Sequence, residues 1–338
     1  MDMKKIEMND MKYDIGNYSS VFILTDENIA PFWLPEVCEW LHCPKAIEII
    51  IKPGEQQKNL RTVQRIWNKL LKNNADRHSL LVNLGGGVIS DMGGFAASCF
   101  KRGIDFINIP TTLLAMVDAS VGGKTGVDFG GYKNQIGTFA EPKAVLLNTV
   151  FLSTLPEREI LSGLAEMLKY GFIADSDLLQ VGLENYESFI QRAAEIKKKI
   201  VADDPFEQGR RKILNFGHTI GHAIESHCLT SENPLLHGEA VALGMWCALW
   251  LSVQKMGLDE MVLRDYERKL PVLLSEAQVV VGEQDIEDIM RKLVHDKKSC
   301  DGKPQFVLLE ALGKSVRDIE IEPDMIREAL MRCSKLFA

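Results

Sequence analysis

The sequence predicts an α/β N-terminal domain built on a parallel sheet, followed by an all-helical C-terminal domain. In residues 1–150, short β-rich runs alternate with helix-length segments, an order typical of a parallel sheet covered on both faces. Beyond residue 150, helical periodicity dominates and β-branched runs are few. A chain of 338 residues is also long enough for two cores. We therefore expect domains at 1–150 and 151–338.

Five apolar runs are the predicted strands: VFILT at 21–25, AIEIII at 46–51, LLVNL at 80–84, DFINI at 105–109 and AVLLN at 144–148. Polar or glycine residues follow these runs, including Asp26 and Asn28 after the first and Thr111 and Thr112 after the fourth. Ligands of a parallel α/β sheet bind at the carboxyl ends of its strands. The pattern predicts a Rossmann-like sheet with a binding site at this edge.

A glycine turn follows the third run. Gly85, Gly86 and Gly87 precede a helical segment, so the backbone could approach a pyrophosphate at a helix N-terminus. Ser90 stands where the last glycine of a GxGxxG fingerprint would be. The alternative is a tight turn packed closely on the sheet.

The segment from Lys101 to Gly137 favours an anion-binding loop. Arg102, Lys124 and Lys133 lie among glycines and hydroxyl side chains, which supply charge, hydrogen-bond donors and close backbone approach. A glycine-rich connection with incidental charge is the alternative, but unperiodic loops of this length are usually functional or disordered.

The second half favours a metal site. Four of the seven histidines lie between His218 and His237, and His218 and His222 are spaced to share one helix face. Glu166 lies in an apolar helical run, GLAEMLKYG, where a buried carboxylate needs a partner. Two histidines and a glutamate with an open position would form a catalytic zinc site. Spacing alone does not choose among His218, His222, His227 and His237, and a polar helix face is the alternative.

Arg211 and Asn215 precede His218 in KILNFGHTIGHAIESH by one to two expected helical turns. This spacing predicts a clamp for a carboxylate or phosphate beside the metal. For Lys198, Lys199 and Lys212 we favour a solvated face.

Composition excludes several classes of protein. The net charge is −8 with both signs interspersed, which argues against a nucleic-acid or anionic-membrane surface. The N-terminal residues MDMKKIEMND lack the apolar core of a signal peptide, so we expect a cytoplasmic protein. The seven cysteines form no CxxC pair and are expected to be reduced thiols.

Six blocks together resemble the 3-dehydroquinate synthase family of sugar phosphate cyclases, in that family's order and with similar spacing. They are GGGVISDMGGFAAS, KRGIDFINIPTTLLAMVDASVGGKTGVDF, KNQIGTF, SGLAEMLKYG, LNFGHTIGHAIE and HGEAVALGM. The resemblance that these blocks carry extends over nearly the whole chain. The resemblance implies an NAD-binding first domain, a helical second domain and an active site in the cleft between them.

The resemblance also implies a reaction of the shikimate pathway of aromatic amino acid biosynthesis. A lyase would convert 3-deoxy-D-arabino-heptulosonate 7-phosphate to 3-dehydroquinate and phosphate. The implied steps are transient oxidation by NAD, phosphate elimination, re-reduction, ring opening and an aldol cyclisation. The implied zinc ligands, which Co2+ could also use, are Glu166, His218 and His237.

The resemblance assigns further residues by motif position. On the cofactor side they are Asp26, Asn28, Glu55, Lys58, Gly86, Gly87, Val88, Ile89, Ser90, Asp91, Thr111, Thr112, Asp118, Lys124, Lys133, Phe151, Leu152, Ser153 and Thr154. On the substrate side they are Lys124, Asn134, Lys169, Lys197, Arg211, Asn215, His222 and one of Lys297 or Lys298. Arg102 matches an arginine contributed across a dimer interface, which implies a homodimer.

Three other functions compete with this interpretation. They are a sister cyclase acting on another sugar phosphate, a metal-dependent polyol dehydrogenase and a nucleotide-binding module without activity. Every expected metal and charge position is filled, which argues against the last. Asp128 stands where the family frequently has asparagine, and we expect its charge near Lys124 to weaken phosphate binding.

Overall fold

The computed structural model describes residues 2–5, 14–229, 231, 233–277, 281–294 and 304–337. The chain divides into two compact units, Met1–Leu155 and Pro156–Ala338. The division lies five residues beyond the expected one at 150/151, immediately before the Pro156 that precedes a long helix.

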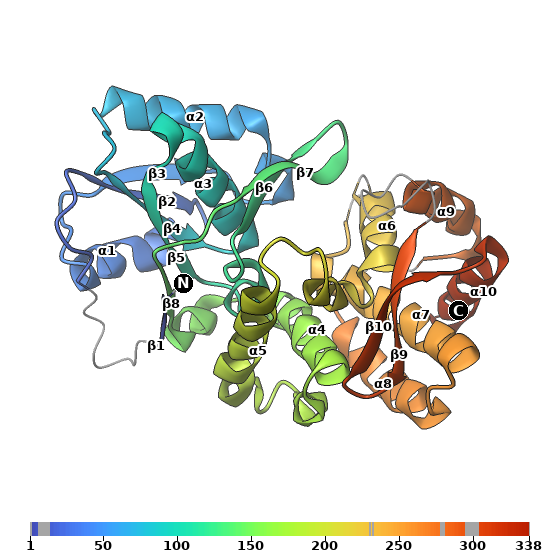
Figure 1. Ribbon diagram of the computed structural model, residues 1–338. Coiled ribbons are helices and arrows are strands. Elements are labelled where there is room, and N and C mark those ends of the chain that lie inside the picture. The colour runs from blue at the N-terminus through green and yellow to red at the C-terminus, as the bar shows by residue number, and fades with distance from the viewer. Residues whose placement is uncertain are drawn as a thin grey trace. The chain divides into compact units, whose positions relative to one another are not determined.

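Unit 1 contains a six-stranded sheet in which every neighbouring pair is parallel (Figure 1). Its order is β1-β8-β5-β4-β2-β3. The strands are β1 (Asp2–Lys5), β2 (Val21–Asp26), β3 (Ile47–Ile51), β4 (Leu80–Gly85), β5 (Asp105–Pro110) and β8 (Ala144–Leu147). All five predicted strands are confirmed, and β1 was missed. The chain runs from β2 out to β3 and returns to β4 on the other side of β2, so the strand order reverses between β2 and β4.

Helices cover this sheet. They are α1 (Ala30–Trp40), α2 (Leu60–Lys72) and α3 (Gly87–Cys99). Phe22, Leu24 and Leu81 of the strands share a core with Val63 and Ile66 of α2, and α3 adds its apolar face to the same core. In Figure 1, α2 and α3 lie on one side of the sheet and α1 lies on the other.

The segment expected to be an irregular anion-binding loop is largely regular. After a single π-helical turn at Ala115–Ala119, it forms an antiparallel hairpin of β6 (Lys124–Phe129) and β7 (Tyr132–Phe139). Gly130 and Gly131 make the turn with φ of 62° and 81°, the left-handed backbone that a two-residue hairpin turn requires. The hairpin packs against α3, which is visible in Figure 1.

Unit 2 is mainly helical. Its helices are α4 (Glu157–Ile173), α5 (Ile190–Asp203), α6 (His218–Cys228), α7 (His237–Met256), α8 (Glu260–Leu273), α9 (Ile286–Val294) and α10 (Pro323–Ser334). Helix α7 is apolar on nearly all sides and is buried from Gly238 to Ser252, so it forms the centre of the unit. It contacts α4, α6, α8 and α10.

The sequence predicted an all-helical second domain, and this was wrong in one respect, because unit 2 also contains two strands. Strands β9 (Gln305–Ala311) and β10 (Lys314–Glu320) form an antiparallel hairpin whose turn contains Gly313 with φ of 73°. β9 packs against α7 because Phe306 to Leu309 are all buried. The hairpin therefore adds its apolar strand to the helical core.

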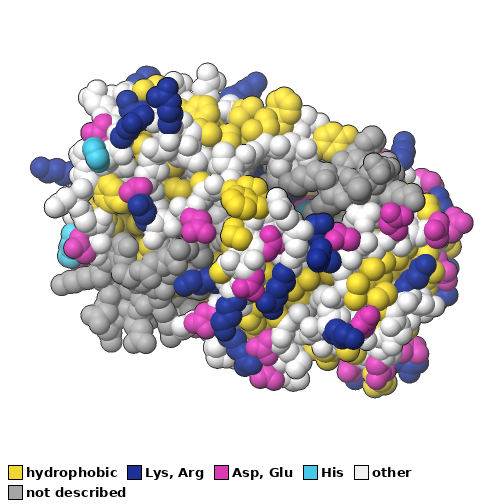
Figure 2. All heavy atoms as spheres, in the orientation of Figure 1, with side chains coloured by type: hydrophobic (Ala, Val, Ile, Leu, Met, Phe, Trp, Pro, Cys, Tyr) yellow, Lys and Arg dark blue, Asp and Glu magenta, His cyan; other side chains and the backbone are white. Residues whose placement is uncertain are grey.

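The surface agrees with the composition. Acidic and basic side chains are largely interspersed on the face drawn in Figure 2. Among the described helices, none combines the length and apolar character needed to cross a bilayer. The predicted cytoplasmic location stays a prediction. Cysteines 38, 43, 99, 228, 247 and 333 are free thiols, and Cys300 lies outside the described residues.

Candidate metal and anion site

Three helices of unit 2 bring two histidines to one buried carboxylate. Glu166 lies midway along α4, His218 begins α6 and His237 begins α7. His218 Nε2 is 3.2 Å from Glu166 Oε1, and His237 Nε2 is 3.6 Å from the same oxygen. Glu166 is fully buried, and among the described residues neither of its oxygens accepts a hydrogen bond of normal geometry. Two nitrogen donors and a carboxylate therefore converge where a cation would complete the coordination.

The second ring nitrogen of each histidine also faces an acceptor. His218 Nδ1 lies 3.1 Å from the carbonyl oxygen of Phe216, and His237 Nδ1 lies 3.2 Å from Glu225 Oε2. An acceptor at Nδ1 places the proton of a neutral imidazole there and leaves the Nε2 lone pair available. In both rings Nε2 faces Glu166 while Nδ1 faces an acceptor. Metal-binding histidines have this arrangement, with the second nitrogen donating to an acceptor outside the metal site.

His222 is the third histidine of this group. Its ring centre is 5.2 Å from that of His218 and 5.7 Å from that of His237, which confirms the predicted shared face of α6. Ring nitrogens of the three histidines lie within 4.8 Å of one another. The structure therefore allows two donor sets, either His218, His222 and His237, or Glu166 with His218 and His237. His227 is elsewhere, since its ring contacts Asp285 and Asp288.

Charges around Glu166 keep it ionised. Burial alone would raise the pKa of its carboxyl group, but Lys169 and His218 hold that pKa well below its usual range. The Lys169 ammonium group, itself buried, contacts Glu166 Oε2. Burial disfavours a charged His237, yet the carboxylates of Glu225 and Glu166 raise its pKa to about 9. The carboxylates of Glu225 and Glu166 thus favour positive charge at His237, as a cation site requires.

Arg211 and Asn215, the residues of the predicted anion clamp, do not lie on a continuous helix with His218. The helix expected from Lys212 to His227 is interrupted, because Arg210–Asn215 is a 3₁₀ helix and Gly217 adopts φ of 77° before α6 starts. Arg211 is buried and its Nη1 donates to the carbonyl of Pro205 at 2.6 Å. Asn215 donates to Glu207 Oε1 at 2.8 Å.

In unit 1, the predicted cofactor residues gather at the carboxyl ends of the strands. Asp26 ends β2 and accepts hydrogen bonds from the backbone of Asn28 and Ile29 at 2.9 and 3.2 Å. Gly86 follows β4 and is the N-cap residue of α3, so these two strand ends flank the reversal of strand order. A ligand site at this position is typical of parallel sheets. A Cβ at Gly86 would lie 3.0 Å from Thr112 Cγ2, so glycine keeps this turn open.

A chain of charges extends from this edge. Lys58 is buried and donates to Asp91 Oδ2 at 2.6 Å, while Lys133 Nζ lies 3.0 Å from Glu55 Oε1. Although burial opposes it, Asp91 and Glu55 raise the pKa of Lys58 above its usual value. These four residues belong to the predicted cofactor set, and the structure brings them together.

Asp128 makes two contacts with the main chain, and its expected effect on phosphate binding stays a prediction. Its Oδ1 accepts a hydrogen bond from the backbone N–H of Asn134 at 2.7 Å, and its own N–H donates to the carbonyl of Lys58 at 2.8 Å. Asn134 has φ of 52°, so the hydrogen bond holds it in left-handed backbone. Asp128 therefore joins a predicted cofactor residue to a predicted substrate residue. Lys124 is exposed at the start of β6.

Several other predicted cofactor residues have side chains that are buried in unit 1. The side chains of Ile89, Ser90, Thr111, Phe151 and Leu152 are buried. Four more residues lie nearby in the chain, namely Val88, partly buried on α3, Asp118 in the π-helical turn, and Ser153 and Thr154 in a 3₁₀ helix. Thr154 Oγ1 accepts a hydrogen bond from Trp33 at 2.9 Å. Lys197 is buried on α5, and Lys297 and Lys298 lie outside the described residues.

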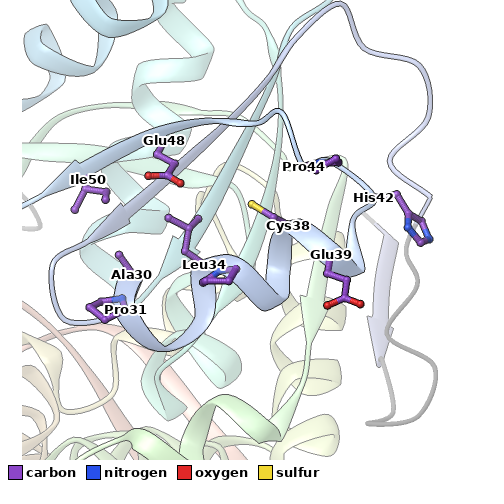
Figure 3. A pocket seen from close by; sticks show the side chains of 10 residues that line it. Ala30, Pro31, Leu34, Cys38, Glu39, His42, Pro44, Glu48 and Ile50 are labelled. Carbon is purple, nitrogen blue, oxygen red and sulfur yellow. The ribbon is translucent and has the colours of Figure 1, made fainter.

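A separate hollow of about 950 Å³ lies between α1 and the edge strand β3 (Figure 3). Leu34, Cys38 and Ile50 line it together with Glu39 and Glu48. None of the predicted site residues lines it, so this hollow is not the predicted active site.

Sequence reasoning missed Glu225. This residue is buried on α6, three positions after His222 and seven after His218, and its carboxylate contacts His237. Helical spacing alone could have placed it on the face that carries the two histidines.

Proteins similar to this chain identify its family. A family model for the N-terminal part of 3-dehydroquinate synthase matches residues 48–162, and one for the C-terminal part matches residues 163–299. The 3-dehydroquinate synthase of Parabacteroides distasonis is 40% identical over 349 residues, covering 98% of this chain and 96% of that protein.

Two solved structures share the fold. One is ValA, a 2-epi-5-epi-valiolone synthase from Streptomyces hygroscopicus subsp. jinggangensis with NAD+ and Zn2+ bound; the TM-score is 0.85, the identity 26%, and the match covers 99% of this chain and 96% of that one. The other is a 2-deoxy-scyllo-inosose synthase complexed with carbaglucose-6-phosphate, NAD+ and Co2+; the TM-score is 0.85, the identity 24%, and the coverage 98% and 96%. With both family models matched in order and such identity over almost the whole chain, the chain belongs to the 3-dehydroquinate synthase family.

Proposed function

We propose that this protein is a 3-dehydroquinate synthase that converts 3-deoxy-D-arabino-heptulosonate 7-phosphate to 3-dehydroquinate and phosphate. In this reaction it acts as a carbon–oxygen lyase and uses NAD and a divalent cation. The observation that carries the proposal is the convergence of His218 Nε2 and His237 Nε2 on the buried carboxylate of Glu166. Membership of the family supplies the substrate.

Glu166, His218 and His237 would hold the cation, because they offer two imidazole nitrogens and a carboxylate whose remaining contacts fix their orientation. When bound, Zn2+ would polarise a substrate hydroxyl group while NAD accepts a hydride and later returns it. The related ValA structure, which contains NAD+ and Zn2+, supports both cofactors. His222 lies beside the cation ligands and would bind a substrate oxygen.

Residues of unit 1 would bind NAD. Asp26 has a carboxylate at the end of β2 suited to ribose hydroxyl groups, and the Gly86–Gly87 turn offers backbone N–H groups to a pyrophosphate. Burial of Ile89, Ser90 and Phe151 means that these residues would contribute backbone atoms or packing. The ion pair between Lys58 and Asp91 would keep this edge of the sheet rigid, since Lys58 Nζ lies 2.6 Å from Asp91 Oδ2.

The substrate carries a phosphate and a carboxylate, so the enzyme needs several cations. Lys124, Arg211 and Lys197 would supply positive charge, with Asn134 and Asn215 as hydrogen-bonding partners. Lys169 contacts Glu166, and its ammonium group would also hold a proton close to the reacting oxygen. Eliminating phosphate and closing the ring demand orientation more than a protein nucleophile, which suits a site of fixed, buried charges.

The relatives also weigh against the rival functions. The match to a 3-dehydroquinate synthase is 40% identical, whereas the match to the valiolone synthase ValA is 26% identical. A sister substrate would leave the carboxylate-binding charges without a purpose. A polyol dehydrogenase would accumulate NADH with each turnover.

The test is an assay of phosphate release from 3-deoxy-D-arabino-heptulosonate 7-phosphate with NAD at catalytic concentration. We expect release without accumulating NADH, loss of release after treatment with a chelator, and recovery on adding Zn2+. Stoichiometric NADH would instead identify a dehydrogenase. No release by protein that binds both NAD and Zn2+ would contradict the proposed substrate.

We further infer a homodimer in which Arg102 serves the partner's site. Arg102 is exposed, and its φ of 68° follows the 50° of Lys101, so the backbone holds this side chain out at a sharp corner. Arg102→Ala and His218→Ala are each expected to be inactive alone. Mixed after reversible dissociation, they should recover up to about a quarter of wild-type activity, as statistical assortment of shared sites predicts. No recovery in a mixture shown to contain heterodimers would contradict a shared site.

A further inference from the structure

Glu225 is a buried carboxylate next to the metal site that none of the proposed steps uses. It is 3% exposed and lies on α6, on the helix face that also carries His218 and His222. Its Oε2 is 3.2 Å from Nδ1 of His237. Burying a carboxylate is costly unless it is paired, so its position calls for a physical reason.

The contact fixes the tautomer of His237. An ionised carboxylate can only accept a hydrogen bond, so Nδ1 of His237 must carry the proton. A neutral ring then has its lone pair on Nε2, the atom that lies 3.6 Å from Glu166. Without this acceptor, a ring on the first residue of α7 could rotate or exchange tautomers.

The two histidines differ in this respect. His218 Nδ1 faces a backbone carbonyl, the oxygen of Phe216, which follows the main chain and is uncharged. His237 Nδ1 faces a side chain that carries a full negative charge and belongs to another helix. A charged acceptor makes the imidazole more basic and therefore a stronger ligand for a cation.

We propose that Glu225 is a positioning residue for the metal site, one that orients His237 and strengthens its bond to the cation. The inference rests on the proposed function, because it takes Glu166, His218 and His237 as the ligands. The competing role is purely structural, in which Glu225 fastens α6 to the start of α7. The two roles differ in what they predict for metal affinity and for the stability of the metal-free protein.

The experiment measures Zn2+ affinity of the full-length protein by competition with a chromophoric chelator. E225Q keeps the shape of the side chain but loses the charge, and E225A loses the acceptor. We expect about 10- to 100-fold weaker Zn2+ binding in both, with E225A the weaker, as for other outer partners of metal-bound histidines. The visible absorption of the Co2+-loaded protein should shift in E225Q, because the loss of the charge at Glu225 changes the ligand field that His237 exerts on the Co2+ ion. E225D, which restores the charge, should recover part of the affinity.

Glu267→Gln is the matched control. Glu267 accepts a hydrogen bond from Trp246 Nε1 at 3.1 Å, so its carboxylate also contacts a side chain of α7. Trp246 lies nine residues after His237 in that helix. We expect its Zn2+ affinity to equal that of the wild type. Thermal unfolding of each metal-free variant separates affinity from folding, and E225Q decides the question if E225A does not fold.

Wild-type Zn2+ affinity in E225Q and E225A would overturn the inference. So would a loss of affinity matched by a large fall in the melting temperature of the metal-free E225Q protein, which indicates the structural role. Failure of the proposed function looks different, because the wild-type protein would then bind no Zn2+ or release no phosphate when loaded.

Discussion

Replacing Glu166 by alanine is expected to abolish both Zn2+ binding and phosphate release, and to lower the free energy of unfolding by about 3 kcal/mol. The carboxylate is a proposed ligand and is also the group that contacts the buried ammonium of Lys169. Removing one member of a buried ion pair leaves the other in a low-dielectric surrounding, which is why the stability effect is large. Elemental analysis after dialysis measures the metal, and urea unfolding of the metal-free protein measures stability.

The double variant Glu166→Gln with Lys169→Met separates the two effects. With both charges replaced by side chains of similar length, most of the lost stability should return, while Zn2+ binding should not. Glu157→Ala is the control, since Glu157 lies exposed in the first turn of the same helix and should change neither property. Normal zinc content in Glu166→Ala would show that the metal uses another donor set, of which His218, His222 and His237 are the candidate.

The parts of the fold that could be predicted are those with a strong hydrophobic pattern. The continuous apolar runs of β2, β4 and β5 are buried along their length, and α7 is apolar enough to be recognised as a central helix. The hairpin β6–β7 escaped prediction because its residues are largely polar or glycine and few of them are buried. Its Gly130–Gly131 turn was a usable signal. The β9–β10 hairpin escaped because the surrounding sequence is helical, although FVLL in β9 is a buried apolar run.

The site shows the same limit. Residue chemistry singled out Glu166 and the histidines, because a carboxylate in an apolar helix needs a partner. Choosing His237 over His227 needed either the resemblance or the tertiary structure, since the two lie on different helices. The charge on Asp128 could be read from the sequence, but its hydrogen bond to Asn134 depends on how the β6–β7 turn is folded.

Substituting Gly244 by alanine is expected to destabilise the protein by about 3 kcal/mol, at the upper end of what overpacking usually costs. Gly244 lies within α7 where that helix meets the backbone of α6. A Cβ there would lie 2.6 Å from Gly221 N and 2.9 Å from Gly221 Cα, and closer still to the carbonyl oxygen of Gly217. These are main-chain atoms, so they cannot rotate away as a side chain could.

Helix propensity alone predicts that Gly244→Ala would raise the free energy of unfolding, so the experiment distinguishes the two effects. Inside a helix, alanine is favoured over glycine by about 1 kcal/mol, so a helix free of contacts would become more stable. Gln254→Ala, at an exposed position of the same helix, serves as the control and should stay within about 0.5 kcal/mol of wild type.

The consequence extends to the metal site, because α6 carries His218 and α7 begins at His237. Forcing the two helices apart lengthens the distance between their ligands, so Gly244→Ala should bind Zn2+ more weakly than Gln254→Ala does. Urea unfolding of the metal-free proteins and chelator competition test both effects. A Gly244→Ala variant as stable as the wild type would mean that the close approach of α6 and α7 is not what fixes the spacing of the histidines.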